Sequence, residues 1–170
     1  MIFKGKDFYV DLLEDEDLKE VVLVYNSNKN FLMKHIGKGS VTEEWILGEI
    51  KCMRELYFYP CKIVDKANMK LVGVMDFKID KESYLSLLML NSTYKNRGLG
   101  KLVYEGFEKY VKEKGSLGIR IDVVCEYDNK VLSFWKRNGF IEIENVKLKW
   151  TSKALPAVVM RKSFDASIHF

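Results

Sequence analysis

Leu88-Met89-Leu90-Asn91-Ser92-Thr93-Tyr94-Lys95-Asn96-Arg97-Gly98-Leu99-Gly100-Lys101 is the stretch of the chain that decides its fold. It runs from an apolar strand through a polar turn into the start of a helix. Such a helix start leaves backbone N–H groups unpaired and carries a partial positive charge. Gly98 and Gly100 keep side chains away from those donors, and three neighbouring basic residues add positive charge. The stretch is therefore suited to bind a phosphate group, although a Gly-x-Gly at a helix start is more often simply a tight turn.

Two familiar phosphate-binding loops do not fit this stretch. A Walker loop ends in Gly-Lys-Ser/Thr, but Gly100-Lys101 is followed by Leu102. A dinucleotide-binding loop has a third glycine where this chain has Val103, and it belongs early in a parallel unit. A tight turn without a ligand is the remaining alternative, so the rest of the chain has to decide.

The sequence after this stretch predicts a parallel crossover unit. Apolar residues recur with a helical period from Leu99 to Val111, and Lys114-Gly115 ends that helix. Ile119 to Cys125 then alternates apolar and polar residues, which is typical of a strand. A strand, a helix and a strand in succession make parallel neighbours. The remaining predicted elements are a short helix from Asn129 to a Gly139 cap, and strands at about Ile141–Trp150 and Ala157–Ser163.

The sequence before this stretch predicts antiparallel strands behind two helices. Short polar turns join the predicted strands Cys61–Asp65, Lys70–Lys78 and Tyr84–Leu90, and such short links favour antiparallel pairing. Further upstream we expect a strand at Phe8–Leu13, a helix at Leu18–Tyr25 that ends at Asn26–Asn30, and a helix whose start is a Ser40/Glu43 capping box. The fold class is thus α/β (α+β): a mixed, mostly antiparallel sheet of six to seven strands with helices on both faces, in a single domain over residues 1–170.

Composition narrows the functional classes. Of 170 residues, 48% are hydrophobic and 31% charged, which argues against disorder. The net charge of +4 is too small and scattered for nucleic acid. No apolar run approaches the about 20 residues that cross a bilayer, and the first residues, Met1 to Lys6, lack the apolar stretch typical of a signal peptide. The three cysteines match no metal or redox pattern, so we expect reduced thiols, no metal and a cytoplasmic location.

Two motifs together resemble the GNAT superfamily of N-acetyltransferases. Lys95-Asn96-Arg97-Gly98-Leu99-Gly100 is similar to the family's motif A, Gln/Arg-x-x-Gly-x-Gly/Ala, with Lys95 at the Gln/Arg position. The segment Asp128 to Phe140 resembles motif B, Asn-x-x-Ala-x-x-Phe-Tyr-x-x-x-Gly-Phe, with Trp135 at the tyrosine position. The order of elements agrees from about Phe8 to Ser163, so the resemblance covers nearly the whole chain.

The resemblance implies a GNAT fold and a site for acetyl-CoA. Two adjacent parallel strands, Tyr84–Leu90 and Ile119–Cys125, would splay apart around the cosubstrate. Backbone groups of Met89 and Leu90 would pair with its pantetheine arm, and the Leu90 N–H would also hydrogen-bond the acetyl carbonyl and its oxyanion. Asn129 would contact the pantetheine arm or the phosphates, while Asp128 is better read as a helix N-cap. The residues implied to bind the pyrophosphate are Lys95, Asn96, Arg97, Gly98, Leu99, Gly100 and Lys101.

The resemblance also implies direct transfer of an acetyl group to a primary amine. The ammonium must lose a proton and the departing thiolate is helped by an acid. Trp135 does not release its indole proton, so the usual acid is missing or replaced. Tyr127 is the candidate acid and Glu126 the candidate base. Asp122 is read as a surface or helix-facing carboxylate, and Glu14–Asp17 as charges that serve the helix dipole rather than an amine.

Three functions remain open on sequence alone. The first is an acetyl-CoA-dependent N-acetyltransferase for a small-molecule or peptide amine, without nucleic-acid or membrane partners. The second is a non-catalytic sensor or interaction module that binds acyl-CoA, which the Trp135 replacement keeps open. The third is a nucleotide-binding protein unrelated to CoA. A homodimer is common in the family, although the sequence carries no signature of its own for one. Trp150–Pro156 is expected to be a loop near the acceptor.

Overall fold

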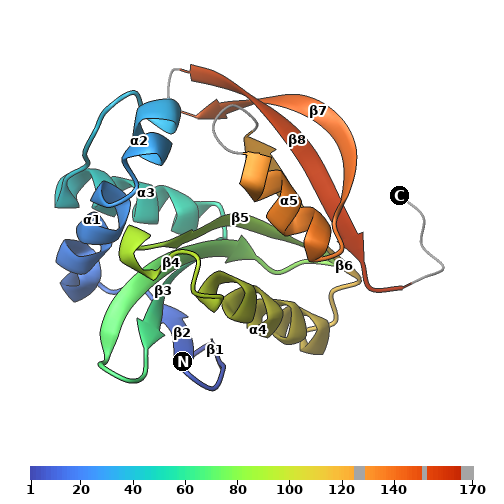
Figure 1. Ribbon diagram of the computed structural model, residues 1–170, viewed down its shortest axis with the longest axis horizontal. Helices are drawn as coiled ribbons and strands as arrows, with labels where there is room; N and C mark the ends of the chain where they lie inside the picture. Colours follow the sequence, from blue (N-terminus) through green and yellow to red (C-terminus); the bar gives the residue numbers. More distant parts are fainter. Residues whose placement is uncertain (125–128, 151–152, 166–170) are drawn as a thin grey trace.

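The computed structural model describes residues 1–124, 129–150 and 153–165. Within these residues, eight strands form one sheet in the order β1-β2-β3-β4-β5-β6-β8-β7 (Figure 1). Every neighbouring pair is antiparallel except β5 and β6, which are parallel. The strands are β1 (Phe3–Lys4), β2 (Phe8–Leu12), β3 (Tyr59–Asp65), β4 (Lys70–Lys78), β5 (Glu82–Leu90), β6 (Gly118–Val124), β7 (Ile141–Trp150) and β8 (Lys153–Ser163).

This sheet confirms the predicted fold class, with one strand more than expected. The additional strand is β1, which has two residues and so shows no alternation by which sequence could reveal it. A second difference concerns Trp150–Pro156, which was expected to be a loop. Lys153 to Pro156 belongs to β8 instead, and Pro156 is paired with Lys147 of β7. Leu155 explains the extension of the strand, because its side chain is buried in a small cluster with Val124 and Ala157.

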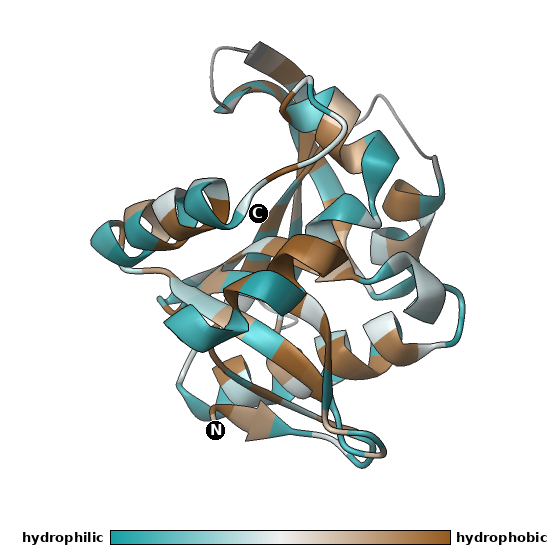
Figure 2. Ribbon diagram, turned by 90° about the vertical axis from the view of Figure 1, so that its left-hand side faces the viewer, coloured by the Kyte–Doolittle hydropathy of each residue, from teal (hydrophilic) through white to brown (hydrophobic). Residues whose placement is uncertain are grey.

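Helices cover both faces of the sheet, as the sequence predicted. They are α1 (Leu18–Asn26), α2 (Lys29–His35), α3 (Glu43–Glu55), α4 (Leu99–Glu113) and α5 (Asn129–Arg137). Short 3-10 turns, η1 (Asp15–Asp17) and η2 (Ser92–Tyr94), precede α1 and follow β5. Figure 2 shows helices banded with hydrophilic and hydrophobic residues, the pattern of helices that bury one side against a sheet.

The core on the α4/α5 face is rich in aromatic residues. Phe77 and Phe107 are fully buried with ring centroids 5.0 Å apart. Trp135 of α5 lies edge-on to Tyr104 of α4, with 5.4 Å between centroids. Burying a phenylalanine-sized side chain contributes about 1.5–3 kcal/mol, so these contacts anchor both helices to the sheet.

The opposite face carries a second core under α1, α2 and α3. Val24 and Leu32 are completely buried there with Val74 of β4. Helix α2 was not predicted, because its seven residues are too few for a periodic pattern to stand out. His35 is a buried residue of α2, and its ring stacks on that of Phe31 with 4.0 Å between the centroids.

Helix α3 begins two residues later than the predicted capping box. Thr42, not Ser40, is its N-cap, and the Thr42 side chain accepts a hydrogen bond from the Trp45 N–H at 3.3 Å. The preceding Val41 is buried in the core of this face. Val41 thus stands directly before the cap, and its burial fixes the direction in which the chain enters the helix at Glu43.

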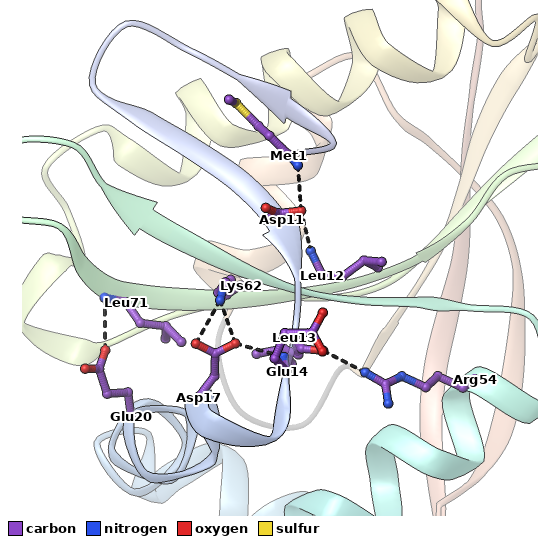
Figure 3. Close-up of polar contacts among 10 residues, drawn as sticks. All are labelled: Met1, Asp11, Leu12, Leu13, Glu14, Asp17, Glu20, Arg54, Lys62 and Leu71. Atoms are coloured by element: carbon purple, nitrogen blue, oxygen red, sulfur yellow. Dashed lines mark hydrogen bonds and ion pairs between the residues drawn. The ribbon is translucent and has the colours of Figure 1, made fainter.

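The acidic segment before α1 is tied to the sheet and to α3 (Figure 3). Both carboxylate oxygens of Asp17 accept hydrogen bonds from Lys62 Nζ of β3, at 2.9 and 2.7 Å. Arg54 donates to the Leu13 carbonyl at 2.6 Å. Asp17 thus has a structural partner, and its pairing with Lys62 supports the interpretation that this segment serves the fold.

Candidate functional site

The parallel strands β5 and β6 are paired only at their beginnings. Their register comprises Glu82 with Gly118, Ser83 with Ile119, and Tyr84 with Arg120. Beyond Tyr84, β5 stays paired with β4 as far as Leu90, and β6 stays paired with β8 as far as Val124. The two strands therefore turn unpaired edges toward each other, and we call this place the β5–β6 divergence. It confirms the predicted splaying of these strands.

The pairing with β4 decides which backbone groups of β5 face the divergence. Successive residues of an antiparallel strand point their N–H and C=O alternately toward and away from the partner. The Asn91 N–H donates to the Val72 carbonyl of β4, so Met89, two residues earlier, also points toward β4. In agreement, a Cβ placed on Gly73 of β4 would lie only 2.6 Å from the Met89 carbonyl oxygen. Leu90 consequently faces the divergence, whereas Met89, expected to do the same, is turned toward β4.

The turn after β5 brings the predicted phosphate-binding residues together ahead of α4. The Asn91 side chain accepts a hydrogen bond from the Thr93 N–H at 3.1 Å and so shapes the 3-10 turn η2. Asn96 and Gly98 both have left-handed backbone conformations, with φ of 60° and 81°. Gly98 is the N-cap of α4. Within the described chain, no backbone acceptor pairs with the N–H groups from Asn96 to Lys101.

The glycines of this turn leave open space that the fold itself does not use. A Cβ on Gly98 would have no atom within 4 Å, although its left-handed conformation still disfavours other residues. A Cβ on Gly100 would meet only the Leu90 side chain, at 3.7 Å, an ordinary contact. Packing therefore does not explain Gly100. The open donors and the open space together fit a diphosphate.

Basic side chains surround this turn. Lys95, Arg97 and Lys101 are all exposed. The Arg97 guanidinium lies 5.8 Å from the centre of the Tyr94 ring, and Lys101 Nζ lies 3.6 Å from a Glu105 carboxylate oxygen. Exposed pairs of this kind are weak, so both cations can turn toward an anionic ligand at little cost.

The face of the divergence opposite α4 and α5 carries a polar cluster that the sequence did not predict. Asp122 of β6 accepts a hydrogen bond from the Tyr84 hydroxyl at 3.0 Å, and two from the Arg120 guanidinium at 2.9 and 3.1 Å. Ile119, Ile121 and Val123 belong to the α4/α5 core, so the alternating Arg120 and Asp122 point the other way.

Burial and ionic pairing define the chemistry of this cluster. The Asp122 side chain is only 4% exposed, so it is not the surface carboxylate that was one of the two interpretations of the sequence. Burial raises the pKa of Tyr84, and the nearby Asp122 carboxylate raises it further. Tyr84 therefore stays protonated and acts as a hydrogen-bond donor. Sequence showed that Asp122 and Arg120 share a strand face, but only the pairing of β5 with β6 brings Tyr84 to them.

The predicted catalytic residues fall outside the described part of the chain. Glu126, Tyr127 and the candidate N-cap Asp128 all lie in residues 125–128. Asn129 is the first residue of α5, but its side chain is likewise outside the description. Trp135, at the position of the family's usual acid, is buried against Tyr104, Phe134 and Phe140. Its indole thus serves packing.

A small cavity under α1 and α3 holds two further carboxyl groups. Asp76 of β4 and Glu49 of α3 line it together with Tyr25 and apolar residues. Asp76 is 8% exposed. Burial, and to a lesser extent the Glu49 carboxylate, raises the pKa of Asp76 to about 7. The site at the divergence does not include this pair, which lies on the inner side of the helices.

A second hollow lined by described residues is also separate from the divergence. It is an open groove of about 680 Å³ between α4, the end of α5 and β8. Glu108 in this groove accepts hydrogen bonds from Tyr104 and Lys112 of its own helix and from Lys162 of β8, which ties α4 to β8. Lys101 borders this groove and is the only one to do so among the predicted cosubstrate residues whose side chains the structure describes.

Two further properties concern the described residues alone. They contain no cluster of three or more histidine, cysteine or acidic side chains placed to hold a metal ion. None of the helices found in them combines the length and the apolar character that a membrane crossing demands.

Comparisons with known proteins agree with this geometry. Residues 61–164 match the family model of the acetyltransferase (GNAT) domain, and no curated protein matches the chain in sequence. A GNAT-family acetyltransferase structure from Bacillus anthracis has a TM-score of 0.74 at 18% identity, over 95% of this chain and 97% of that one. The ribosomal-protein-S5-alanine acetyltransferase from Vibrio fischeri gives 0.71 at 18% identity, over 96% and 97%. The PaiA N-acetyltransferase from Thermoplasma acidophilum, solved with coenzyme A, gives 0.61 at 22% identity, over 94% and 100%. At these identities the likenesses establish the fold.

Proposed function

This chain belongs to the GNAT family of acetyltransferases, which use acetyl-CoA, and from that premise we propose that it transfers the acetyl group to a primary amine. The observation that carries the proposal is the turn before α4. The N–H groups from Asn96 to Lys101 pair with no backbone acceptor in the described chain, and the space beside Gly100 would accommodate a side chain that this residue does not have. Both properties suit a ligand that carries a diphosphate.

The turn from Lys95 to Lys101 would hold the pyrophosphate of the cosubstrate. Backbone N–H groups from Asn96 to Lys101 would donate to phosphate oxygens. Lys95 would supply the positive charge that a glutamine or arginine supplies elsewhere in the family, although as a point charge without a planar fork. Asn129, at the start of α5, would contact the pantetheine arm or the phosphates.

The backbone of Leu90 would serve the transfer itself. Acetyl-CoA supplies an acetyl group activated as a thioester. The Leu90 N–H faces the β5–β6 divergence and would donate a hydrogen bond to negative charge that develops on the carbonyl oxygen. Leu88 has the same orientation as Leu90 by strand alternation, so its backbone, rather than that of Met89, would provide the second contact.

The acceptor amine would approach from the face of the Tyr84–Asp122–Arg120 cluster. The pyrophosphate turn lies at the start of α4, on the other side of the sheet, so this face remains for the acceptor. Glu126 and Tyr127 follow directly after β6 in sequence and would act as base and acid. Arg120 balances the charge of Asp122, so Asp122 would shape the approach of the amine rather than remove its proton.

Both a small-molecule amine and a peptide amine suit this arrangement. Known proteins with this fold include one named for a ribosomal-protein alanine and one named PaiA N-acetyltransferase. We expect action in the cytoplasm, where thiols such as Cys52 and Cys61 stay reduced, and leave a homodimer as an expectation from the family.

A screen for CoA release tests the proposal. Acetyl-CoA is incubated with polyamines, aminoglycosides, amino acids and peptides that have free N-termini, and the released thiol is measured. Amine-dependent release with formation of the acetylated amine supports the proposal. If the protein binds CoA but no amine causes release of the thiol from acetyl-CoA, transfer to an amine is contradicted and a non-catalytic acyl-CoA sensor is favoured. Failure to bind CoA while simple nucleotides bind contradicts the assignment of the turn.

A further inference from the structure

Asn28 occupies the N-cap position of α2 but does not cap that helix. Asparagine at this position ordinarily accepts a hydrogen bond from a backbone N–H of the first turn. In this chain the side chain makes no such bond. Asn28 is also 5% exposed, and a buried side-chain amide requires partners. Its identity therefore has to be explained by contacts outside α2.

The amide of Asn28 reaches from α1 to the end of β5. Its Nδ2 donates to the Val24 carbonyl at 2.8 Å and to the Leu90 carbonyl at 2.9 Å. Leu90 lies 62 residues further along the chain and faces the β5–β6 divergence. A strand partner would normally satisfy such a carbonyl, but β6 has already departed. Asn28 thus replaces the missing strand partner of Leu90.

Ser27 makes a second tie to the same segment. Its hydroxyl donates to the Val24 carbonyl at 2.7 Å and accepts a hydrogen bond from the Ser92 N–H at 2.9 Å. Two neighbouring side chains at the junction of α1 and α2 therefore hold Leu90 and Ser92. The last residue of β5 and the first of η2 are fixed in this way, next to the pyrophosphate turn.

We propose that Asn28 is a positioning residue for acetyl transfer. The Leu90 carbonyl and the Asn91 N–H belong to one rigid peptide plane, and Asn28 and the Val72 carbonyl hold that plane from its two sides, which limits the rotation of the backbone next to Leu90. The carbonyl oxygen has two lone pairs, so Asn28 leaves one for a ligand. The junction of α1 and α2 thereby holds Leu90 with its N–H toward the divergence. This inference rests on the proposed function, in which that N–H contacts the cosubstrate.

Asn26 offers a matched control for the test. Its Nδ2 donates to the Val41 carbonyl at 3.2 Å, and its Oδ1 accepts from the Val41 N–H at 2.8 Å. Asn28→Asp and Asn26→Asp therefore each replace an amide donor by a carboxylate oxygen facing a backbone carbonyl. The variants differ in whether the affected carbonyl belongs to β5.

The experiment measures three quantities for both variants and the wild type: thermal stability, acetyl-CoA affinity by calorimetry, and kcat with an amine from the screen. At temperatures where both variants are folded, we expect kcat and acetyl-CoA affinity of Asn28→Asp to be at least tenfold lower than those of Asn26→Asp. Values for the two variants within twofold of each other overturn the inference.

Affinity separates this inference from the proposed function. If the wild type acetylates no amine, the proposed function fails, but the difference in acetyl-CoA affinity between the variants still decides the role of Asn28. If Asn28→Asp does not fold, Ser27→Ala takes its place in the comparison with the same criterion, because it removes the tie to Ser92 together with the hydroxyl's bonds to Val24 and Asn28.

Discussion

The Tyr84 hydroxyl donates to the buried carboxylate of Asp122 across the last paired position of β5 and β6. Arg120 donates two further hydrogen bonds to the same carboxylate, so the cluster has no net charge. It stands on the face from which we expect the acceptor. A substitution that disturbs its charge should therefore affect the amine more than the cosubstrate.

Asp122→Asn leaves the Arg120 cation without its partner on the acceptor face. We expect the KM for a cationic amine to rise at least fivefold, because the uncompensated charge repels it, while acetyl-CoA affinity stays within twofold. Steady-state kinetics with the amine varied, and calorimetry with acetyl-CoA, check this. Higher salt should reduce the effect on KM. A loss of acetyl-CoA affinity with an unchanged amine KM would place the cluster elsewhere in the mechanism.

Gly100→Ala separates ligand binding from folding. A Cβ at this position meets only Leu90 at an ordinary 3.7 Å, so stability should be unchanged or higher by up to about 1 kcal/mol. The same Cβ enters the space assigned to the diphosphate, and acetyl-CoA affinity should fall at least tenfold, or about 1.4 kcal/mol. Calorimetry and thermal unfolding measure the two quantities. Full affinity in the folded variant removes the turn from the cosubstrate site.

Gly73→Ala should damage the site through the sheet. A Cβ on Gly73 would lie 2.6 Å from the Met89 carbonyl oxygen and 2.7 Å from a Leu90 methyl group, so β5 has to shift. We expect a loss of about 1–3 kcal/mol in stability, and weaker acetyl-CoA binding as Leu90 moves.

Gly48→Ala is the control for both glycine variants. Gly48 is an exposed residue inside α3 with open space around its Cα. We expect this variant to gain about 0.5–1 kcal/mol in stability and to bind acetyl-CoA as the wild type does. If Gly73→Ala behaves like Gly48→Ala, the close approach of β4 and β5 is not required.

Asp76 should make stability depend on pH. Its pKa is raised from 3.8 to about 7 by burial, so between these values the folded state holds a proton that the unfolded state has lost. Stability is then fully present below about pH 4 and falls as pH rises to about 7, with a slope of at most about 1.4 kcal/mol per pH unit. Asp76→Asn does not ionise, and its curve should be flatter in this window. Denaturant unfolding at several pH values measures both proteins, and parallel curves contradict the assignment.

Tyr127→Phe tests the candidate acid. Removing the hydroxyl should lower kcat more than acetyl-CoA affinity, because the proton it supplies is needed only as the thiolate leaves. The pH profile of kcat with the best amine is compared with that of the wild type. An unaltered rate at every pH removes Tyr127 from the mechanism.

Long periodic segments made most of the fold predictable. The helical period from Leu99 to Val111 and the alternation from Ile119 onward gave α4 and β6 to within a residue or two at most ends. The Gly139 cap is also confirmed, with a φ of 90° and a buried Phe140 after it. Short elements failed for the opposite reason, since β1 and α2 owe their conformation to tertiary contacts rather than to a pattern of their own.

The residues of the site likewise divide into those that a local pattern reveals and those that depend on tertiary contacts. Gly98 and Gly100 were identifiable because a local turn needs them, and their surroundings agree with the expected role. Asp122 and Asn28 were not, because their partners, Tyr84 and Leu90, lie 38 and 62 residues away along the chain. A strand pattern does not fix which neighbour each peptide faces, so the turn of the Met89 backbone toward β4 could be read only from the pairing of the strands.

Only three paired positions, all between β5 and β6, join the two parts of the described sheet. On one side lie β1 to β5, and on the other β6, β8 and β7. A molecule bound between the unpaired lengths of β5 and β6 would add contacts between the two parts that the polypeptide itself does not make. The heat resistance of the protein should consequently track the concentration of its cosubstrate, because a ligand held by both parts favours only the folded chain. Purification and storage with CoA would then protect the enzyme against unfolding that begins with the separation of β5 from β6.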